Sequence, residues 1–415
     1  MKSIIHNSSI VAPALLFSFM GLFSSGPQLV GQTTSQWSQF RGPDFENRST
    51  TQMPGSINNA SIAWKKDLPG RGVSGPITVD GRVFVSCSST AKQNELHLFC
   101  FDAASGQELW HRQFWALGRC GTDPTSANAA PTPASDGKHV VAFYSSNDLA
   151  CFDLDGNLKW LRALTDDYPK AANDVGMSSS PIIKDGRIYV QVENQGDSFA
   201  AAIDLETGQN LWKEARPKKA SWSSPLLISQ TGHSDMLVLL SADRLSALNA
   251  EDGKLLWEFE GPTYPIPSPA YVKDSNILLA SINGLSAFRL NGSEKPEKLW
   301  NEQRLSPSNI SVAIDGSQII TLNRGSVAVC ADVDSAEEAW KTRIGGNHYS
   351  SPIIAGKFVY FFAQDGTARV VDRSMVEPEV VSEFKFEQPI LGSPAADATG
   401  IYIRLQNQLV KLASQ

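Results

Sequence analysis

The stretch AAIDLETGQNLW (201–212) runs from an apolar segment through a turn at Thr207-Gly208 to a tryptophan. Gly208 lies four residues before Trp212, and the same offset separates Gly from Trp in three further stretches. Glycine adopts the positive φ angles of a tight hairpin, and a fixed offset sets the face that the indole occupies, because a slip of one residue would turn it over. The stretch therefore predicts a strand–turn–strand unit that recurs along the chain. The further copies are CFDAASGQELW (100–110), CFDLDGNLKW (151–160) and ALNAEDGKLLW (247–257).

A second signal, Ser-x-Pro or a close variant, precedes each unit and leads into a short apolar strand and a turn such as Asp80-Gly81. One copy, NISVAIDG (309–316), lacks the proline; with it counted, the seven intervals from Pro76 to Pro394 average about 45 residues. Four short strands joined by hairpin turns in a repeat of this length are typical of a β-propeller blade. The seven copies of the Ser-x-Pro signal that keep the proline have it at residues 76, 133, 181, 225, 269, 352 and 394.

Tryptophan closes nearly every unit, at spacings of 40 to 52 residues, and Phe384 is expected to take this place in the one unit without it. A ring around one cofactor would use one or two stacking tryptophans, so the repetition favours a structural role in docking each blade on the next. Burial of one indole removes roughly 150–250 Å² from water, a gross gain of about 4–6 kcal/mol. The docking tryptophans are Trp64, Trp110, Trp160, Trp212, Trp257, Trp300 and Trp340.

These patterns predict an all-β fold, an eight-bladed β-propeller of four-stranded antiparallel blades over residues 59–415. Trp64 lies in an outer strand with no inner strands before it, whereas the last unit, from Gly392, has three strands and no fourth. We therefore expect N- and C-terminal strands to complete one blade together and close the ring, which removes exposed sheet edges.

The first 58 residues are expected to lie outside the propeller. The apolar run IVAPALLFSFMGLF (10–23) has 14 residues, too few to span a bilayer, which needs about 20, but suited to the core of a signal peptide. We predict a signal peptide over residues 1–31 and an extended segment over 32–58, with an uncleaved anchor as the alternative. The mature chain is expected to be exported to the periplasm or the extracellular space, not membrane-spanning, and monomeric.

The net charge and the positions of the cysteines limit which functions and covalent bonds can be expected. The net charge of −7 gives no basis for binding nucleic acid. Three cysteines, at positions 100, 151 and 330, stand two residues before the Asp of a repeat, where other copies have Ala, so we predict small buried side chains there. The pairing of Cys87 and Cys120 is left open by the sequence.

The loops that precede each Ser-x-Pro signal are predicted to gather at the mouth of the central funnel, where they could contact a ligand or a partner. The segment WSQFRGP (37–43) is expected to dock on the propeller face, with Arg41 pairing a loop carboxylate. The six histidines show no metal-ligand spacing, and the sequence has no nucleophile elbow and no phosphate-binding loop. The candidate binding residues are Arg71, Asn128, Trp222, Tyr264, His348 and Tyr349, with Met177 and Asn309 in equivalent places.

With its repeats aligned, the chain resembles the pyrroloquinoline-quinone-repeat propellers over roughly residues 37–415. The four stretches above are similar to that family's A-x-D-x-x-x-G-x-x-x-W docking motif, with Cys often in the Ala place and one copy a residue short. WSQFRGP looks like an exported branch whose members mostly lack an assigned activity. Related quinoprotein dehydrogenases hold the quinone and Ca²⁺ in the funnel, but their adjacent-cysteine disulfide and C-x-x-C-H haem motif are absent here. Outer-membrane assembly propellers are similar in size, and their lipid-attachment cysteine is also absent.

The leading hypothesis is a non-catalytic exported propeller that binds an exported protein or a small ligand through its funnel face, with no cofactor and no metal. The alternative is a dehydrogenase that uses pyrroloquinoline quinone and Ca²⁺ to oxidise an alcohol or a sugar. That alternative requires carboxylates in the funnel, and a hydrolase or sugar-binding site at the same place is a third hypothesis. The carboxylates nearest to the predicted funnel are Asp123, Asp166, Asp167 and Asp174.

Overall fold

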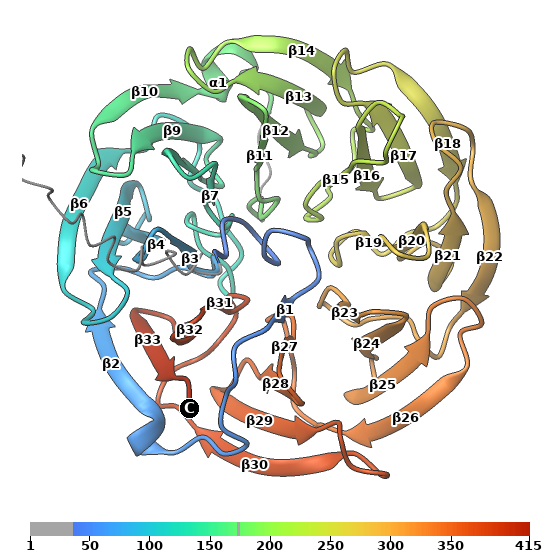
Figure 1. The fold of residues 1–415 in the computed structure, drawn as a ribbon. Coiled ribbons are helices and arrows are strands. Elements are labelled where there is room, and N and C mark those ends of the chain that lie inside the picture. The colour runs from blue at the N-terminus through green and yellow to red at the C-terminus, as the bar shows by residue number, and fades with distance from the viewer. Residues whose placement is uncertain (1–35, 172–174) are drawn as a thin grey trace, which may run out of the picture. The chain divides into compact units, whose positions relative to one another are not determined.

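The computed structural model describes residues 36–171 and 175–415, and the predicted signal peptide and Asp174 lie outside these ranges. Eight β-sheets stand around a common centre as the blades of a propeller (Figure 1). Each blade has four antiparallel strands, to which blade 7 adds the short parallel strand β1 (Arg48–Ser49) at its inner edge. In blades 1–7 the four antiparallel strands follow one another outward in chain order. The predicted fold class is therefore confirmed. No helix of these residues is long and apolar enough to cross a membrane.

The strands of blades 1–4 follow the four repeats that the sequence marks most clearly. They are β3 (Ile77–Val79), β4 (Arg82–Ser89), β5 (Glu95–Asp102) and β6 (Glu108–Trp115) in blade 1, and β7 (Ala134–Ser135), β8 (His139–Phe143), β9 (Asp148–Asp153) and β10 (Leu158–Ala163) in blade 2. Blade 3 has β11 (Ile182–Lys184), β12 (Arg187–Val192), β13 (Phe199–Asp204) and β14 (Asn210–Ala215), and blade 4 has β15 (Leu226–Ile228), β16 (Met236–Ser241), β17 (Arg244–Asn249) and β18 (Leu255–Glu260).

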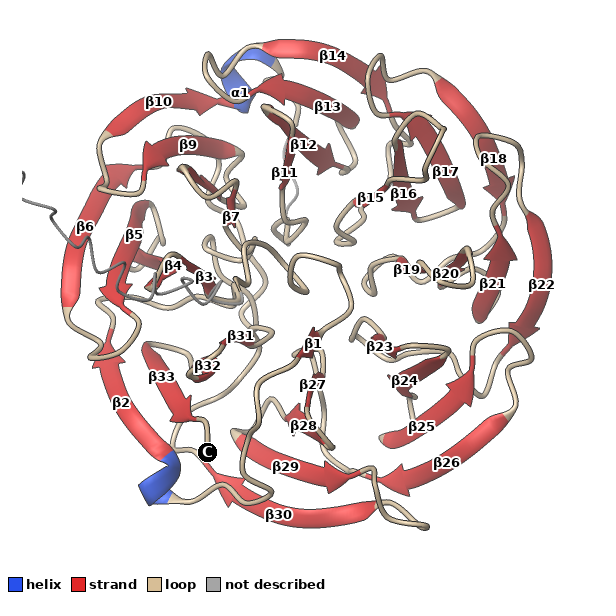
Figure 2. Ribbon diagram, viewed as in Figure 1, coloured by secondary structure: helices blue, strands red, loops and turns tan. Residues whose placement is uncertain are grey.

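Blades 5–7 continue the ring (Figure 2). They comprise β19 (Ala270–Val272), β20 (Ile277–Ala280), β21 (Leu285–Arg289) and β22 (Glu297–Glu302); β23 (Ala313–Asp315), β24 (Gln318–Leu322), β25 (Val327–Asp332) and β26 (Glu338–Arg343); and β27 (Ile353–Ala355), β28 (Phe358–Phe362), β29 (Thr367–Asp372) and β30 (Glu379–Lys385). Helical turns are short: the 3₁₀ turn η1 (Asn59–Ser61) and the α-helix α1 (Leu164–Asp167).

Blade 8 is built from both ends of the described chain. Its inner strands are β31 (Ala395–Asp397), β32 (Gly400–Arg404) and β33 (Gln408–Ala413), and its outermost strand is β2 (Ile62–Asp67). β2 pairs antiparallel with β33, with Lys65 opposite Val410. Closure of the ring by N- and C-terminal strands is thus confirmed.

The docking tryptophans of the outer strands join neighbouring blades. Trp160 pairs across the sheet with Cys151, and its Nε1 donates to the Leu205 carbonyl in the turn of the next blade at 2.8 Å. Gly208 of that turn has φ +71°, and a Cβ atom there would lie 2.8 Å from the Trp160 ring. Glycine is therefore required twice, by the turn and by the indole. The same kind of bond links Trp64 to Ala103, Trp110 to Leu154, Trp212 to Ala250 and Trp300 to Val333.

The prediction that Phe384 replaces the missing tryptophan in blade 7 is wrong. The register places Ser382 opposite Val370, in the position that tryptophan holds in other blades. The backbone N–H of Ile57 donates to Ser382 Oγ at 3.1 Å, and Ile57 itself is buried, so the segment before β2 covers the place of an indole. Phe384 instead packs edge-on against Phe386.

The cores lie between the facing sheets of neighbouring blades. One cluster of buried side chains joins Val141 of blade 2 to Ile188 of blade 3, and another joins Val238 of blade 4 to Leu278 of blade 5. The three cysteines of the repeats are at most 1% exposed, as predicted, and all five cysteines are free. Burial raises the pKa of the Cys100 thiol to about 12, so it behaves as a small apolar side chain.

Residues 37–53, which we call the axial strap, cross the centre of the ring (Figure 1). Strand β1 (Arg48–Ser49) pairs in parallel with β27 and gives blade 7 a fifth strand. Trp37 bridges to Thr78 of blade 1, and the Glu46 carbonyl accepts from the N–H of Ile314 in blade 6. The strap thus ties together blades that lie far apart around the ring.

Arg41 of the strap does not pair a carboxylate, contrary to the prediction. Its guanidinium is buried and donates to the backbone carbonyls of Pro269 at 2.6 Å and Val312 at 3.2 Å. These carbonyls lie at the start of innermost strands, where the strap passes closest to the ring. Burial lowers the pKa of Arg41 to about 9.

Candidate functional site

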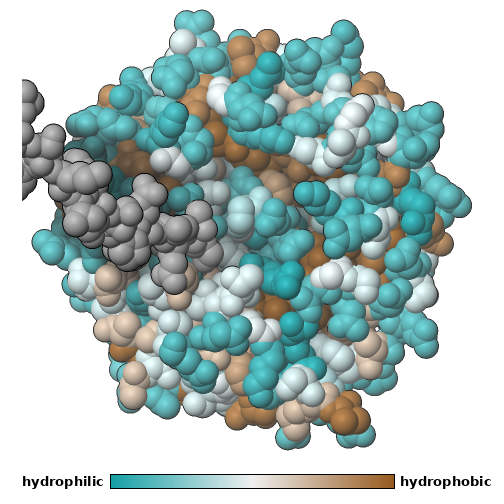
Figure 3. Space-filling model, in the orientation of Figure 1, coloured by the Kyte–Doolittle hydropathy of each residue, from teal (hydrophilic) through white to brown (hydrophobic). Residues whose placement is uncertain are grey.

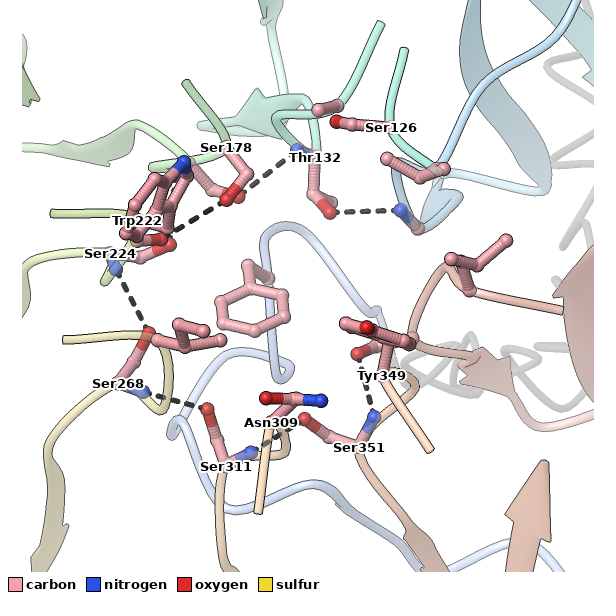
Figure 4. Close-up of a pocket in the computed structure, with 18 of the residues that line it drawn as sticks. Ser126, Thr132, Ser178, Trp222, Ser224, Ser268, Asn309, Ser311, Tyr349 and Ser351 are labelled. Atoms are coloured by element: carbon pink, nitrogen blue, oxygen red, sulfur yellow. Dashed lines mark hydrogen bonds between the residues drawn. The ribbon is translucent and has the colours of Figure 1, made fainter. Parts of the chain in front are cut away.

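The second residue before each innermost strand contributes to a ring of side-chain hydroxyls around the centre of the propeller. In seven of the eight blades this residue is Ser or Thr, and each hydroxyl oxygen accepts a hydrogen bond from the backbone N–H of the equivalent residue one blade earlier (Figure 4). We call this set the hydroxyl ring. Its bonds run from Gly75 to Thr132 (2.9 Å), Thr132 to Ser180 (3.0 Å), Ser180 to Ser224 (2.9 Å), Ser224 to Ser268 (2.9 Å), Ser268 to Ser311 (2.9 Å), Ser311 to Ser351 (3.0 Å) and Ser351 to Ser393 (3.0 Å).

Gly75 of blade 1 holds the eighth position and leaves the hydroxyl ring open at the junction with blade 8. A Cβ atom on Gly75 would lie 2.5 Å from the Ser393 carbonyl oxygen. Blades 8 and 1 therefore approach each other more closely at this point than a side chain allows. At the same junction the buried Arg404 of blade 8 donates to the Ser86 carbonyl of blade 1 at 2.6 Å.

The hydroxyl ring lines a central pocket of about 440 Å³. Above the hydroxyls, apolar side chains and the loops between blades form the walls, with Asp123, Thr125 and Ser126 contributed by the loop between blades 1 and 2. Its volume falls within the range of small-molecule sites, and a mostly apolar lining with a few placed polar groups is typical of such sites. The apolar and aromatic lining residues are Phe40, Val73, Ala130, Val175, Trp222, Ile266, Tyr349 and Leu391.

Two aromatic side chains face each other across this pocket. Trp222 and Tyr349 lie on opposite sides of it (Figure 4), on the loops that enter blades 4 and 7. The Trp222 Nε1 donates to the Gly176 carbonyl at 2.9 Å, which fixes the indole plane. Tyr349 is 38% exposed, and its hydroxyl bonds no group in the described part of the chain.

The axial strap forms the floor of the pocket. Phe40 lines the central pocket, whereas its neighbours Gln39 and Pro43 line a second hollow of about 460 Å³. Ser180 belongs to the first hollow, and residues 182–184 of the same innermost strand belong to the second. The two hollows therefore follow each other along the propeller axis with the strap between them, and the central pocket is closed at one end. Figure 3 shows one face of the propeller, on which hydrophilic side chains predominate and apolar side chains are interspersed.

Three of the eight residues predicted at the funnel mouth line the pocket: Trp222, Tyr349 and Asn309. Tyr264 stands behind this lining, with its hydroxyl donating to Asn309 Oδ1 at 2.5 Å and the Arg324 guanidinium 4.8 Å from its ring. Arg71 also acts indirectly, because its Nη2 donates to the Pro124 carbonyl at 2.7 Å and so holds the loop that carries Asp123.

Asn128, Met177 and His348 are buried outside the pocket. The Asn128 amide donates to the Gln93 carbonyl at 3.1 Å and accepts from the Ser146 N–H at 2.8 Å. The two ring nitrogens of His348 face the carbonyls of Phe362 and Gly345 at 3.0 and 2.9 Å, and burial lowers its pKa. These side chains hold loop backbone in place.

Sequence reasoning missed the hydroxyl ring and Phe40. The signal was present, because a hydroxyl residue stands directly before the proline in most copies of the Ser-x-Pro pattern. Taken alone, that pattern indicates only the start of a strand. These hydroxyls lie at one level because the eight blades form a closed ring, in which every innermost strand begins at the same height along the propeller axis.

Among the described residues that line the pocket, Asp123 is the only carboxylate. Its Oδ1 accepts from the Thr125 N–H at 2.8 Å and hydroxyl at 2.6 Å, which lowers its pKa. Asp166 and Asp167 lie in α1 instead, and Asp167 pairs with Arg162 at 2.6 Å. No group of three or more His, Cys, Asp or Glu in the described ranges could hold a metal ion.

This lining does not fit pyrroloquinoline quinone with Ca²⁺. The quinone is a tricarboxylate, and buried carboxylates need cationic or strongly donating partners. No Lys, Arg or His is among the described residues that line the pocket, and their one carboxylate, at its mouth, is a poor set of ligands for Ca²⁺, which takes six to eight oxygens. The residues of the pocket therefore support no chemical step through the quinone.

Two curated relatives are similar to this chain at the sequence level. Outer membrane protein assembly factor BamB of Bordetella pertussis is 22% identical over 286 residues, which cover 66% of this chain and 67% of that protein. Polyvinylalcohol dehydrogenase of a Pseudomonas species is 22% identical over 370 residues, 77% of this chain and 52% of the enzyme. The chain thus spans about half the length of that enzyme.

Two solved structures share the fold. BamB from Moraxella catarrhalis superposes with a TM-score of 0.61 at 13% identity, covering 84% of this chain and 96% of that one. Quinohemoprotein alcohol dehydrogenase from Comamonas testosteroni gives a TM-score of 0.63 at 13% identity, covering 91% and 80%. The family described as outer membrane protein assembly factor BamB matches residues 56–231 and 219–375, most of the propeller. The chain therefore belongs to this family of pyrroloquinoline-quinone-repeat β-propellers.

Proposed function

We propose that this protein is an exported, non-catalytic binding propeller that holds its ligand or partner at the central pocket and its mouth. The observation that carries the proposal is the chemistry of the described lining: hydroxyls and aromatic faces surround the pocket, and Asp123 is the one carboxylate among these residues. Such a set can orient a bound molecule by hydrogen bonds and apolar contact.

The hydroxyls of the ring are not arranged as nucleophiles. A serine nucleophile needs a general base within hydrogen-bond reach, held in turn by a third group. Here each hydroxyl oxygen of the ring accepts from a backbone N–H, and no histidine or carboxylate of the described chain bonds any of them. Asp123, at the pocket mouth, uses one oxygen to bond Thr125. The lining supports binding and orientation of a ligand.

Export is part of the proposal and rests on two observations of different kinds. The run over residues 10–23 has the length of a signal-peptide core, and the family includes factors named for outer-membrane assembly. We infer that the chain works in the periplasm or outside the cell.

A site-specific photocrosslinker tests where this protein binds. A photoreactive phenylalanine at Tyr349 would face the pocket mouth, whereas one at Leu211, 48% exposed on the outer strand β14, would face away from it. In the exported fraction of the native host, adducts are expected at position 349 and not at position 211, read by mass spectrometry of the purified chain. Adducts at both positions, or at neither, would contradict binding through the funnel.

A cofactor titration tests the non-catalytic part. The purified chain is titrated with pyrroloquinoline quinone and Ca²⁺ while tryptophan fluorescence is followed, and then assayed for dye-linked oxidation of alcohols and sugars. We expect no saturable quenching and no turnover. Saturable quenching that is lost in Trp222→Ala, together with turnover, would establish a dehydrogenase instead.

A further inference from the structure

The hydroxyl ring has hydrogen-bonding capacity that the protein does not use. A hydroxyl carries one donor and two acceptor lone pairs, and each ring oxygen has accepted one backbone N–H. No acceptor in the described part of the chain takes the hydroxyl proton of Ser224, Ser268 or Ser311, although these side chains are at least 91% buried. Each therefore offers one donor and one lone pair to whatever occupies the pocket.

This combination matches a ligand whose own groups both donate and accept. Ligand hydroxyls do so, whereas carboxylate and phosphate oxygens only accept. A ligand with several hydroxyls on a small frame could use many members of the hydroxyl ring at once.

The charge of the lining excludes anions. No cationic side chain is among the described residues that line the pocket, and Asp123 places a carboxylate at its mouth. The second oxygen of Asp123 bonds no group of the described chain, so it can accept from a ligand hydroxyl in a charge-assisted hydrogen bond. An anionic ligand would instead meet this carboxylate, and Arg71, the cation that acts on Asp123, does not line the pocket.

The walls supply apolar faces on both sides of such a ligand. Trp222 and Tyr349 lie opposite each other, and Phe40 forms part of the floor. Rigid aromatic side chains contribute large contact areas, and the free Tyr349 hydroxyl adds a polar tip at the rim. A pyranose ring presents the same alternation, with apolar C–H faces and hydroxyls around its edge.

We propose that the central pocket binds the terminal unit of a neutral saccharide. The proposal rests on the proposed function, because it names the ligand class of the same pocket. The axial strap closes the pocket below, so the pocket admits the end of a glycan chain and not its middle. A free disaccharide and the end of a polymer share this chemistry.

Isothermal titration calorimetry on the chain from residue 32 tests the proposal with maltose, cellobiose and N,N′-diacetylchitobiose as probes. At least one of these should bind one to one with a dissociation constant of about 1 mM or tighter, and glucuronate and glucose 6-phosphate should bind at least about tenfold more weakly. Absence of binding by all three neutral probes, or equal binding of the anions, overturns the proposal. A longer oligosaccharide that binds no more tightly than the disaccharide indicates a free-sugar site, and tighter binding indicates a chain end.

Three variants locate the bound sugar. Tyr349→Ala removes one aromatic face from an exposed position, and Ser126→Trp fills the mouth, so both should weaken binding at least about tenfold. Leu211→Ala, on the outer strand, is the matched control and should leave binding unchanged. Sugar binding that survives both pocket variants contradicts the proposal. Oxidation of a bound sugar would refute the proposed function, whereas crosslinking at position 349 without sugar binding would refute only this inference.

Discussion

At the scale of single residues, the glycine that precedes four of the docking tryptophans carries two constraints that can be separated. Gly208 has φ +71° and the Trp160 ring in the place of a Cβ atom, whereas Gly186 has φ +73° and nothing within 4 Å of that place. Gly186→Ala should therefore cost only the positive-φ strain, about 1–2 kcal/mol. Gly208→Ala should cost a further 1–3 kcal/mol, roughly, because the indole must move. Urea unfolding of the two variants measures the difference, and equal losses would show that the indole contact carries no weight.

The indole N–H groups of the docking tryptophans differ in whether they have a hydrogen-bond partner, and this difference can be tested. Trp160 Nε1 donates to the Leu205 carbonyl, whereas Trp257 Nε1 is buried with no hydrogen-bond partner among the described residues. Replacement by Phe removes a bond in one case and an unpaired donor in the other. Trp160→Phe should therefore destabilise the protein by about 1 kcal/mol more than Trp257→Phe. Thermal unfolding of both variants provides the measurement, and the opposite order would refute this explanation.

Two neighbouring histidines of blade 1, His97 in β5 and His111 in β6, make the stability of the protein sensitive to acid. His97 Nε2 lies 2.8 Å from Ser89 Oγ, and its Nδ1 lies 2.9 Å from His111 Nε2. Burial, with His111 beside it, lowers the pKa of His97 from 6.5 to about 4. Below pH 6.5 the unfolded chain binds a proton that the folded chain refuses until about pH 4, so stability falls as pH falls through this window.

The free energy of unfolding, measured in urea from pH 7 to about pH 4, should therefore decrease by a few kcal/mol at most. In His97→Gln the decrease should be smaller, whereas His233→Gln, at an exposed position, should follow the parent. An identical pH profile for His97→Gln and the parent would exclude His97 as the cause.

At the scale of elements, the repeat could be predicted from sequence and its exceptions could not. Strand order, blade number and the shared blade 8 follow from local patterns that recur at a fixed spacing. The roles of Ser382 and Arg41 could not be predicted in this way, because the axial strap and the segment after it contact residues hundreds of positions away. Ile57 bonds Ser382, and Arg41 bonds Pro269 and Val312. No local pattern encodes those contacts.

In the candidate site, too, some residues could be predicted from the sequence and others could not. The aromatic side chains at the mouth, Trp222 and Tyr349, could be predicted because loops between blades gather at one face. His348 was expected there on the same grounds, yet its ring turns inward to two backbone carbonyls. Loop length places a residue near the funnel, but hydrogen-bond demand of the neighbouring backbone decides which way its side chain points.

At the scale of the whole propeller, stability should depend on closure of the ring. A chain that ends at Arg404 lacks β33, so β2 loses its only partner strand and blade 8 opens. We expect this truncation to abolish the cooperative thermal transition seen by circular dichroism. Removal of Ser414 and Gln415 alone, which lie beyond β33, is the control and should lower the melting temperature only slightly. An unchanged melting temperature after loss of β33 would disprove the dependence on closure.

The pairing of β2 with β33 also has a consequence for biosynthesis. The bond from Gln408 to Asp67 joins residues 341 positions apart, so β2 leaves the ribosome among the first strands and meets its partner among the last. Until then β2 is an unpaired edge, and edges of this kind recruit other chains. A holdase chaperone that shields the unfinished chain from other chains would therefore matter most before β33 has been synthesised. We expect misassembly where newly made chains are crowded together.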